Sequence, residues 1–198
     1  MISFVLDKSE QFCFVSIMTK IGLHHIRVLC SSPGQVVSQA NTLLSHINSV
    51  NNVNKVLLSL QPSVVSQLTP DTVDTWTRVC RNLYTCAKTD LSITFTDIDN
   101  VPVDEELVLD NSSDSDKNDD EDKVDKIYNH VVLGGTFDRI HPGHKILLST
   151  ALLRCETRVT VGVTSSALLT KKLLPELIQP VQDRIDGVKK FISEVYYS

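Results

Sequence analysis

The chain has 198 residues, with 24 acidic against 19 basic side chains and a formal net charge of −5. This acidic balance argues against a general nucleic-acid binder, which usually carries a basic surface. No apolar run reaches the roughly 20 residues that a membrane-spanning helix needs. The five cysteines form no CxxC pair, and no cysteine and histidine set has zinc-ligand spacing. We therefore expect reduced thiols and no metal held by protein side chains.

The amino-terminal residues do not resemble a targeting segment. Asp7 and Glu10 come early, no basic stretch precedes an apolar core, and residues 1–20 contain no arginine. This pattern argues against a secretory signal peptide and a typical mitochondrial presequence. It predicts a cytoplasmic protein and leaves association with the mitochondrial surface by another route open.

Residues 1–109 alternate between strand-like and helix-like patterns. Ser32 followed by Pro33 is a typical helix start, in which a capping residue precedes a first-turn proline. The predicted order is strand Phe12–Ile17, strand His25–Cys30, helix from Pro33, strand Val56–Leu60, helix from Pro70 and strand Leu91–Phe95. This order predicts a small amino-terminal α/β domain.

This first domain contains no chemical motif. His24, His25 and His46 have no partners at ligand spacing, so we expect them to be structural. Trp76 shares the apolar face of its helix with Val73, which predicts a core position. The sequence therefore predicts no particular role for residues 1–109.

Residues 110–126 read DNSSDSDKNDDEDKVDK and are almost devoid of apolar side chains. Such a segment cannot bury enough surface to offset the entropy of ordering it. We expect an acidic, disordered linker between two domains. The linker and residues 1–109 are the parts through which protein partners would be recruited.

Residues 127–198 begin a second α/β pattern. The expected elements are strand Asn129–Leu133, a helix from Pro142 to about Cys155, strand Thr157–Val163 and a helix from about Val181. A strand, helix, strand order implies a right-handed crossover and a parallel sheet. Open sheets of this kind bind ligands beyond the carboxyl ends of their strands.

A glycine turn and a helix start follow the first of these strands. Gly134 and Gly135 end the apolar run, and His141 and His144 lie three residues apart at the helix start, on one face of the helix. Backbone amides and the helix dipole favour negative charge at such a position. Gly143 between the histidines leaves space for a phosphate or a base to approach. The pattern predicts a site for nucleotide phosphate, and the alternative is that one of the two histidines only caps the helix.

Other residues of this segment are assigned by the same reasoning. Thr136 can offer a hydroxyl and an amide to a phosphate, or cap the turn. Phe137 is expected to pack in the core while its amide belongs to the phosphate-facing turn. Asp138 is expected to stabilise the turn. Lys171 and Lys172 follow the second strand, where a lysine can neutralise phosphate or lie in solvent.

The stretch GTFDRIHPGH, from Gly135 to His144, resembles the GTFDxxHxGH pattern of the HxGH nucleotidyltransferase superfamily. Over about residues 128–192 the sequence resembles the phosphopantetheine adenylyltransferase domain of eukaryotic bifunctional coenzyme A synthase. The resemblance implies a Rossmann-like parallel-sheet domain. It also implies transfer of AMP from ATP to 4′-phosphopantetheine, which gives dephospho-coenzyme A and pyrophosphate in coenzyme A biosynthesis.

The resemblance also implies roles for individual residues. His144 would bind the α-phosphate and stabilise its developing charge, and His141 would hold the triphosphate. Thr136 and the amide of Phe137 would orient the attacking phosphate. Lys172, with Lys171 as the alternative, would engage phosphate, and Mg²⁺ would shield the pyrophosphate.

The chain departs from this family in extent. It contains neither an ISSTxxR-like nucleotide loop nor a GxxxxGK[ST] phosphate loop, so we expect only the first half of the nucleotidyltransferase domain, apparently truncated. Two alternatives follow. One is a cytidylyltransferase that uses CTP, since it shares the histidine motif. The other is a catalytically incomplete interaction protein that recruits partners through residues 1–126.

Overall fold

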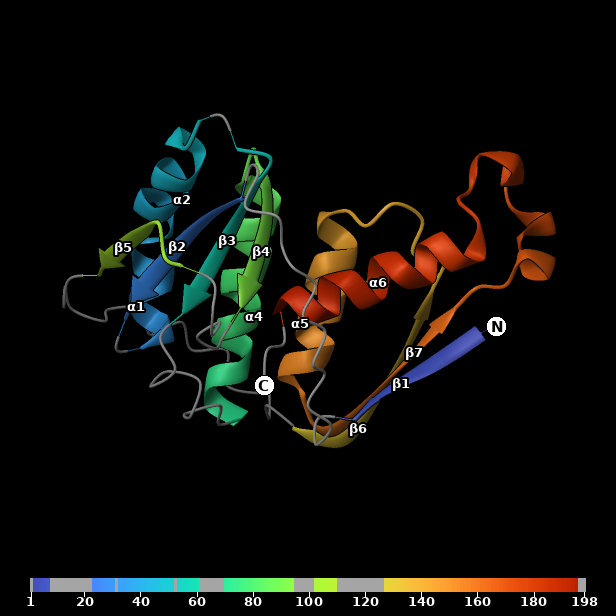
Figure 1. Ribbon diagram of the computed structural model, residues 1–198. Coiled ribbons are helices and arrows are strands. Elements are labelled where there is room, and N and C mark those ends of the chain that lie inside the picture. Colours follow the sequence, from blue (N-terminus) through green and yellow to red (C-terminus); the bar gives the residue numbers. More distant parts are fainter. Residues whose placement is uncertain are drawn as a thin grey trace.

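The computed structural model describes residues 2–7, 23–30, 32–51, 53–60, 70–94, 102–109 and 127–195. These residues form two α/β units, each built on its own sheet (Figure 1). The predicted strand at 12–17 and the acidic segment 110–126 lie outside the described residues.

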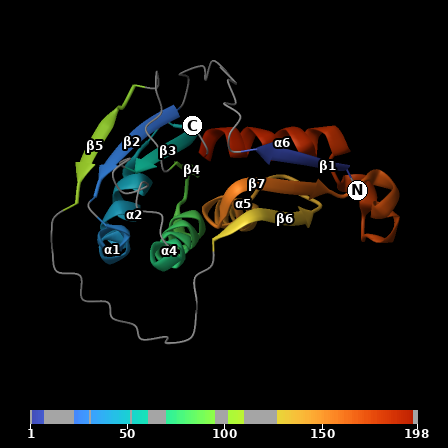
Figure 2. The same cartoon turned by 90° about the horizontal axis from the view of Figure 1, so that it is seen from below.

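The amino-terminal unit is a parallel sheet with strand order β4-β3-β2-β5. Its elements are β2 (Leu23–Leu29), α1 (Pro33–Ser38), α2 (Ala40–Ser49), β3 (Lys55–Leu60), α4 (Pro70–Cys86), β4 (Asp90–Thr94) and β5 (Glu105–Val108). Figure 2 shows α1, α2 and α4 along one side of this sheet. The predicted α/β alternation is confirmed, and β5 is an edge strand that the sequence pattern did not indicate.

The helix predicted from Pro33 begins as expected. The Ser32 hydroxyl accepts a hydrogen bond from the amide of Gln35 at 3.4 Å. At Gln39, where φ is −104°, the helix is interrupted and α2 follows. Trp76 is fully buried, which confirms its predicted core position.

The second unit contains the parallel pair that the sequence predicts. Its elements are β1 (Ile2–Asp7), β6 (Tyr128–Gly135), α5 (Pro142–Leu153), β7 (Cys155–Val163), the 3₁₀ turns η1 (Ser166–Lys171) and η2 (Pro175–Leu177), and α6 (Val181–Val195). β6 and β7 run parallel, with Gly135 opposite Val163. Helix α5 connects them, as the predicted strand, helix, strand order requires.

Strand β1 belongs to this second sheet, although the sequence analysis assigns residues 1–109 to one domain. It pairs antiparallel with β7, from Ile2 opposite Val163 to Asp7 opposite Arg158. The sheet order is therefore β1-β7-β6. The physical reason is the edge of β7, whose amides and carbonyls need a partner strand. A pattern along one strand cannot indicate which distant strand it pairs with.

The two units pack on each other. Helix α4 of the first unit contacts α5 of the second, and strand β4 contacts α6 (Figure 1). Tyr84 and Phe191 meet edge to face with ring centroids 6.2 Å apart. Arg154, at the end of α5, forms an ion pair with Asp74 on α4. One apolar core runs through both units.

Candidate functional site

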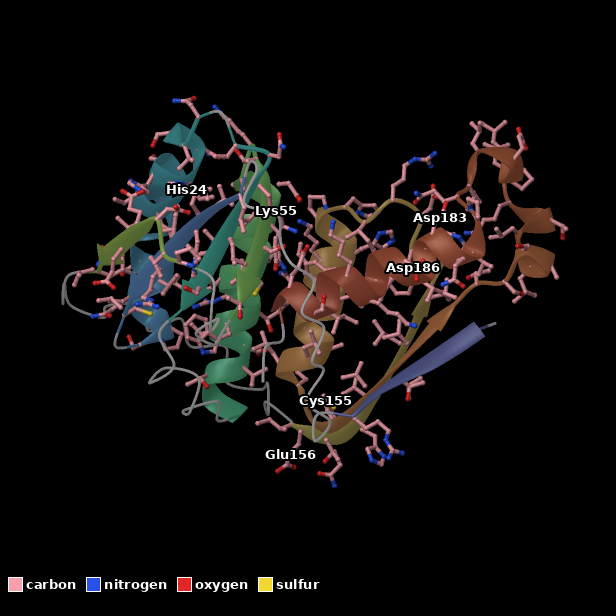
Figure 3. The ribbon with its side chains drawn as sticks, in the orientation of Figure 1. His24, Lys55, Cys155, Glu156, Asp183 and Asp186 are labelled. Carbon is pink, nitrogen blue, oxygen red and sulfur yellow. The ribbon has the colours of Figure 1, made fainter. Side chains whose placement is uncertain are left out.

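The candidate site lies where β6 and β7 end and α5 begins. Figure 3 labels Cys155 at the opposite end of β7, and the strand runs from there towards the site. The amide and hydroxyl of Thr164 both donate to the carbonyl of Gly135, at 3.0 and 3.1 Å. These two bonds hold the two strand ends together. The sequence prediction that a turn and a helix start meet at a carboxyl edge of a parallel sheet is therefore confirmed.

The two histidines are adjacent. The rings of His141 and His144 stack with centroids 3.8 Å apart and an interplanar angle of 27°. His141 is the amino-terminal cap of α5, because its Nδ1 accepts a hydrogen bond from the amide of Gly143 at 3.2 Å. A neutral ring that accepts at Nδ1 carries its proton on Nε2. His141 thus both caps the helix and keeps Nε2 as a hydrogen-bond donor.

The helix end offers fewer amide donors than the sequence analysis expected. Pro142 has no N–H, and the amide of Gly143 is bonded to the His141 ring. The imidazole rings therefore replace part of the backbone as donors at this helix start. His141 is exposed and His144 is half-buried, so both rings lie near the surface.

The surroundings of His144 disfavour its charged form. Its pKa is lowered, first by loss of solvation and then by the neighbouring His141. The carbonyl of Arg139 and the carboxylate of Asp138 partly oppose this shift. The His144 ring also lies near the Phe137 ring, with centroids 5.2 Å apart. At neutral pH the ring is therefore mainly uncharged before an anion arrives.

The loop between β6 and α5 has unusual backbone angles. Phe137 and Arg139 have positive φ, 54° and 43°, a region that costs energy for residues with side chains. Phe137 is 1% exposed, as predicted, and its ring anchors the loop. Asp138 accepts from the amide of Gln179 at 2.9 Å, and the Gln179 side chain accepts from the amide of Arg139 at 2.8 Å. Asp138 therefore has the structural position that the sequence analysis gave it.

Arg184 also supports this loop, although the motifs of the sequence did not indicate it. Its Nη1 donates to the carbonyl of Thr136 at 2.7 Å and its Nε to the carbonyl of Gln179 at 2.9 Å. Arg184 is 1% exposed, whereas Asp183 and Asp186 on the same helix are exposed (Figure 3). The sequence feature that could have indicated this role is the position of Arg184 next to the apolar face of the predicted last helix.

Two glycines have steric reasons for lacking a side chain. A Cβ on Gly135 would lie 3.2 Å from the Phe137 ring, and one on Gly143 would lie 3.1 Å from Cε1 of His141. Gly143 thus makes room first for the capping ring, rather than directly for a ligand. Gly134 lies beside Gly162 of β7 and is exposed.

The predicted lysines lie at the end of η1. Lys172 is exposed, and its amide donates to the carbonyl of Leu169 at 2.8 Å. Among the described contacts, none joins Lys172 to the histidine pair. The side chain of Lys171 lies outside the described residues. The loop after β7 also exposes Leu173 and Leu177, at 91% and 60%.

The histidines of the amino-terminal unit contact residues that are distant in the sequence. His46 and His24 both approach Oε2 of Glu105, at 2.8 and 3.5 Å, and this lowers the pKa of Glu105. His25 is buried against the hydroxyl of Ser59 at 2.8 Å. The pairing depends on β5, which the sequence pattern did not reveal. Their predicted structural role agrees with these contacts.

Within the described ranges, no group of three or more histidine, cysteine, aspartate or glutamate side chains could hold a metal ion. No helix in the same ranges has the length and apolar character to cross a membrane.

Comparison with known proteins agrees with the histidine motif. Residues 132–197 match the family described as cytidylyltransferase-like. The phosphopantetheine adenylyltransferase of Saccharomyces cerevisiae is 48% identical over 64 residues, which cover 32% of this chain and 21% of the yeast protein. Those of Thermococcus kodakarensis and Methanopyrus kandleri are 43% and 39% identical over 67 residues, 34% of this chain and 40% and 41% of theirs. No solved structure matches.

The chain spans about a fifth of the yeast relative and about two fifths of the other two. The matched range, 132–197, contains His141, His144 and Arg184 and falls in the second unit. This unit is therefore similar to nucleotidyltransferases in sequence and has a Rossmann-like parallel β-α-β core.

Proposed function

We propose that the chain transfers AMP from ATP to 4′-phosphopantetheine, giving dephospho-coenzyme A and pyrophosphate. The stacked His141 and His144 pair at the start of α5 carries this proposal. Two imidazoles held at a helix amino terminus, beside the end of a parallel strand, suit a triphosphate better than a neutral ligand. The names of the similar proteins support the choice of reaction.

The proposed step needs no enzyme nucleophile. An oxygen of the substrate phosphate forms a bond to the α-phosphorus of ATP. The bond from that phosphorus to the bridging oxygen breaks, and pyrophosphate leaves with the electron pair. Catalysis then depends on placing the two phosphates in line and stabilising charge on the α-phosphate.

In the proposed transfer, each residue of the site acts on a particular phosphate group. His144 donates to the α-phosphate and gains a proton as negative charge approaches, since its pKa is lowered in the free site. His141 donates from Nε2 to the triphosphate. Thr136 and the amide of Phe137 orient the attacking phosphate at the end of β6. Lys172, with Lys171 as the alternative, engages the phosphates in this proposal. Gly134, Gly135 and Gly143 border the phosphates in this proposal, and Gly135 and Gly143 also leave room for the Phe137 and His141 rings.

We also propose Mg²⁺ as the counter-ion of the nucleotide. Magnesium prefers oxygen ligands and commonly binds through substrate phosphates. The described side chains form no group of three or more that could hold a metal ion, so in this proposal the nucleotide phosphates would hold the magnesium.

The second candidate is transfer from CTP. It is favoured by the description of the matching family as cytidylyltransferase-like. The described residues give no contact that would select adenine over cytosine. Comparing ATP with CTP in one assay separates the two candidates.

The test is release of pyrophosphate by the purified chain with 4′-phosphopantetheine and either nucleotide. We expect turnover with ATP, reduced about 100- to 1000-fold in His144→Ala, as for loss of a group that stabilises transition-state charge. The control is His130→Ala, because His130 is exposed on β6. Turnover with CTP alone would select the cytidylyltransferase. No turnover with either nucleotide would instead support the alternative of a non-catalytic interaction protein, which would recruit partners through residues 1–126.

A further inference from the structure

The residue after His144 connects the candidate site to the amino-terminal unit. Lys145 is 6% exposed. Its ammonium donates to Oδ1 of Asp90 and to the carbonyl of Leu91, both at 2.5 Å. It also lies 5.7 Å from the ring centroids of Tyr84 and Phe191. The first turn of α5 is thus bonded directly to the start of β4, in the other unit.

Further charges surround this contact. Lys55, labelled in Figure 3, pairs with Glu194 of α6 and lies 3.8 Å from Oδ2 of Asp90. The hydroxyl of Ser92 donates to Oε2 of Glu194 at 3.0 Å. A cleft of about 230 Å³ opens here, and its lining includes Phe137 of the site loop. The network therefore joins β4, α5 and α6 behind the histidine pair.

Burial restricts the position of the Lys145 ammonium, because the group needs hydrogen-bond acceptors inside the protein. Burial lowers the pKa of Lys145, and the Asp90 carboxylate partly opposes this shift. Because an unpaired buried charge is costly, the position of Lys145 depends on these acceptors. Successive residues on a helix are about 100° apart, from 3.6 residues per turn. Lys145 can therefore face the amino-terminal unit while His144 faces the site.

The residues that hold Lys145, which form the anchor of α5, lie outside the segment that matches known proteins. Asp90 and Leu91 precede the matched residues 132–197. Their contacts with Lys145 bring the amino-terminal unit, which has no chemical motif of its own, to one residue from His144. This arrangement gives that unit a physical role at the site.

We propose that Asp90 is a positioning residue, which fixes the first turn of α5 through Lys145 and so keeps His141 and His144 in place for the nucleotide. This inference rests on the proposed function. The amino-terminal unit then acts as a brace for the site, without touching substrate.

The test compares two ion pairs of the same helix. Asp90→Asn weakens the anchor at the start of α5. Asp74→Asn breaks the pair with Arg154 at its other end, about 13 Å away for nine residues at 1.5 Å each. Both changes remove one carboxylate charge from the same inter-unit contact. ATP affinity by calorimetry, KM and kcat, and the urea midpoint are measured on the full chain.

We expect Asp90→Asn to weaken ATP binding and transfer about tenfold, since small displacements at a site have large effects on rate. Asp74→Asn should stay within about twofold of the unchanged chain, although both variants unfold at lower urea. Asp90→Glu, which keeps the carboxylate, should recover most of the loss. Equal losses in the two asparagine variants, or no loss in Asp90→Asn, would overturn the proposal.

A second measurement separates this proposal from the proposed function. The amide of Lys145 donates to the carbonyl of His141 at 3.0 Å, so its hydrogen exchange reports on the first turn of α5. We expect faster exchange at residues 143–147 in Asp90→Asn and not in Asp74→Asn. If the unchanged chain neither binds ATP nor transfers AMP, the proposed function fails. The brace fails separately if exchange at 143–147 is the same in both variants.

Discussion

Replacing the buried Arg184 with methionine should strongly lower the free energy of unfolding. The change removes two hydrogen bonds from a charged donor, to the carbonyls of Thr136 and Gln179. Each such bond contributes about 1.5–3 kcal/mol. The loss is partly offset, because Nη2 of Arg184 is buried without a partner among the described residues and this cost disappears. We expect a net loss of about 3 kcal/mol in the free energy of unfolding.

Urea unfolding followed by far-UV circular dichroism and by fluorescence tests this estimate. Trp76, the one tryptophan of the chain, reports on the amino-terminal unit. If the site loop loosens first, circular dichroism should change at lower urea than fluorescence. Arg184→Lys, which keeps a charged donor, should lose less, and Lys190→Met, at an exposed position of α6, should stay within about 0.5 kcal/mol. Unchanged unfolding of Arg184→Met would refute the reasoning.

Three further predictions concern the phosphate site. ATP should bind more tightly as pH falls through the range just above the lowered pKa of His144. Phosphate raises that pKa in the complex, so binding takes up a proton, and calorimetry in buffers of different ionisation enthalpy would detect it. A His144→Gln variant should lose this uptake. Gly143→Ala should weaken ATP binding several-fold, because its Cβ displaces the His141 ring. Thermal stability should change little, since the helix preference of alanine, about 0.5–1 kcal/mol, offsets the loss of the cap bond to that ring. Lys172→Ala should raise the Kd for ATP about tenfold by loss of one phosphate-facing charge, and an unchanged Kd would remove Lys172 from the site.

The sequence predicted the parts of the fold that local patterns encode. Ser32 before Pro33 gave the correct helix start, and Gly135 to Pro142 gave the correct turn between β6 and α5. The adjacency of His141 and His144 followed from their helical spacing. Each of these features depends on residues within a few positions of one another.

Contacts between distant segments could not be predicted in this way. Nothing along the chain indicates that Lys145 meets Asp90, or that Arg184 holds the carbonyl of Thr136. Helix capping by one of the two histidines was an alternative that the sequence could not decide, because the pattern alone does not distinguish a capping histidine from a phosphate ligand. The structure shows that the cap leaves Nε2 of the same ring as a donor.

The pairing of β1 with β7 places the first described strand in the sheet of the carboxyl-terminal unit. A fragment that starts at residue 127 would lose this strand and expose the edge of β7 to other molecules. Proteolytic cleavage between the units need not separate them, because residues 2–7 would remain inserted in the other fragment's sheet. Two pieces produced separately could then reassemble by fragment complementation.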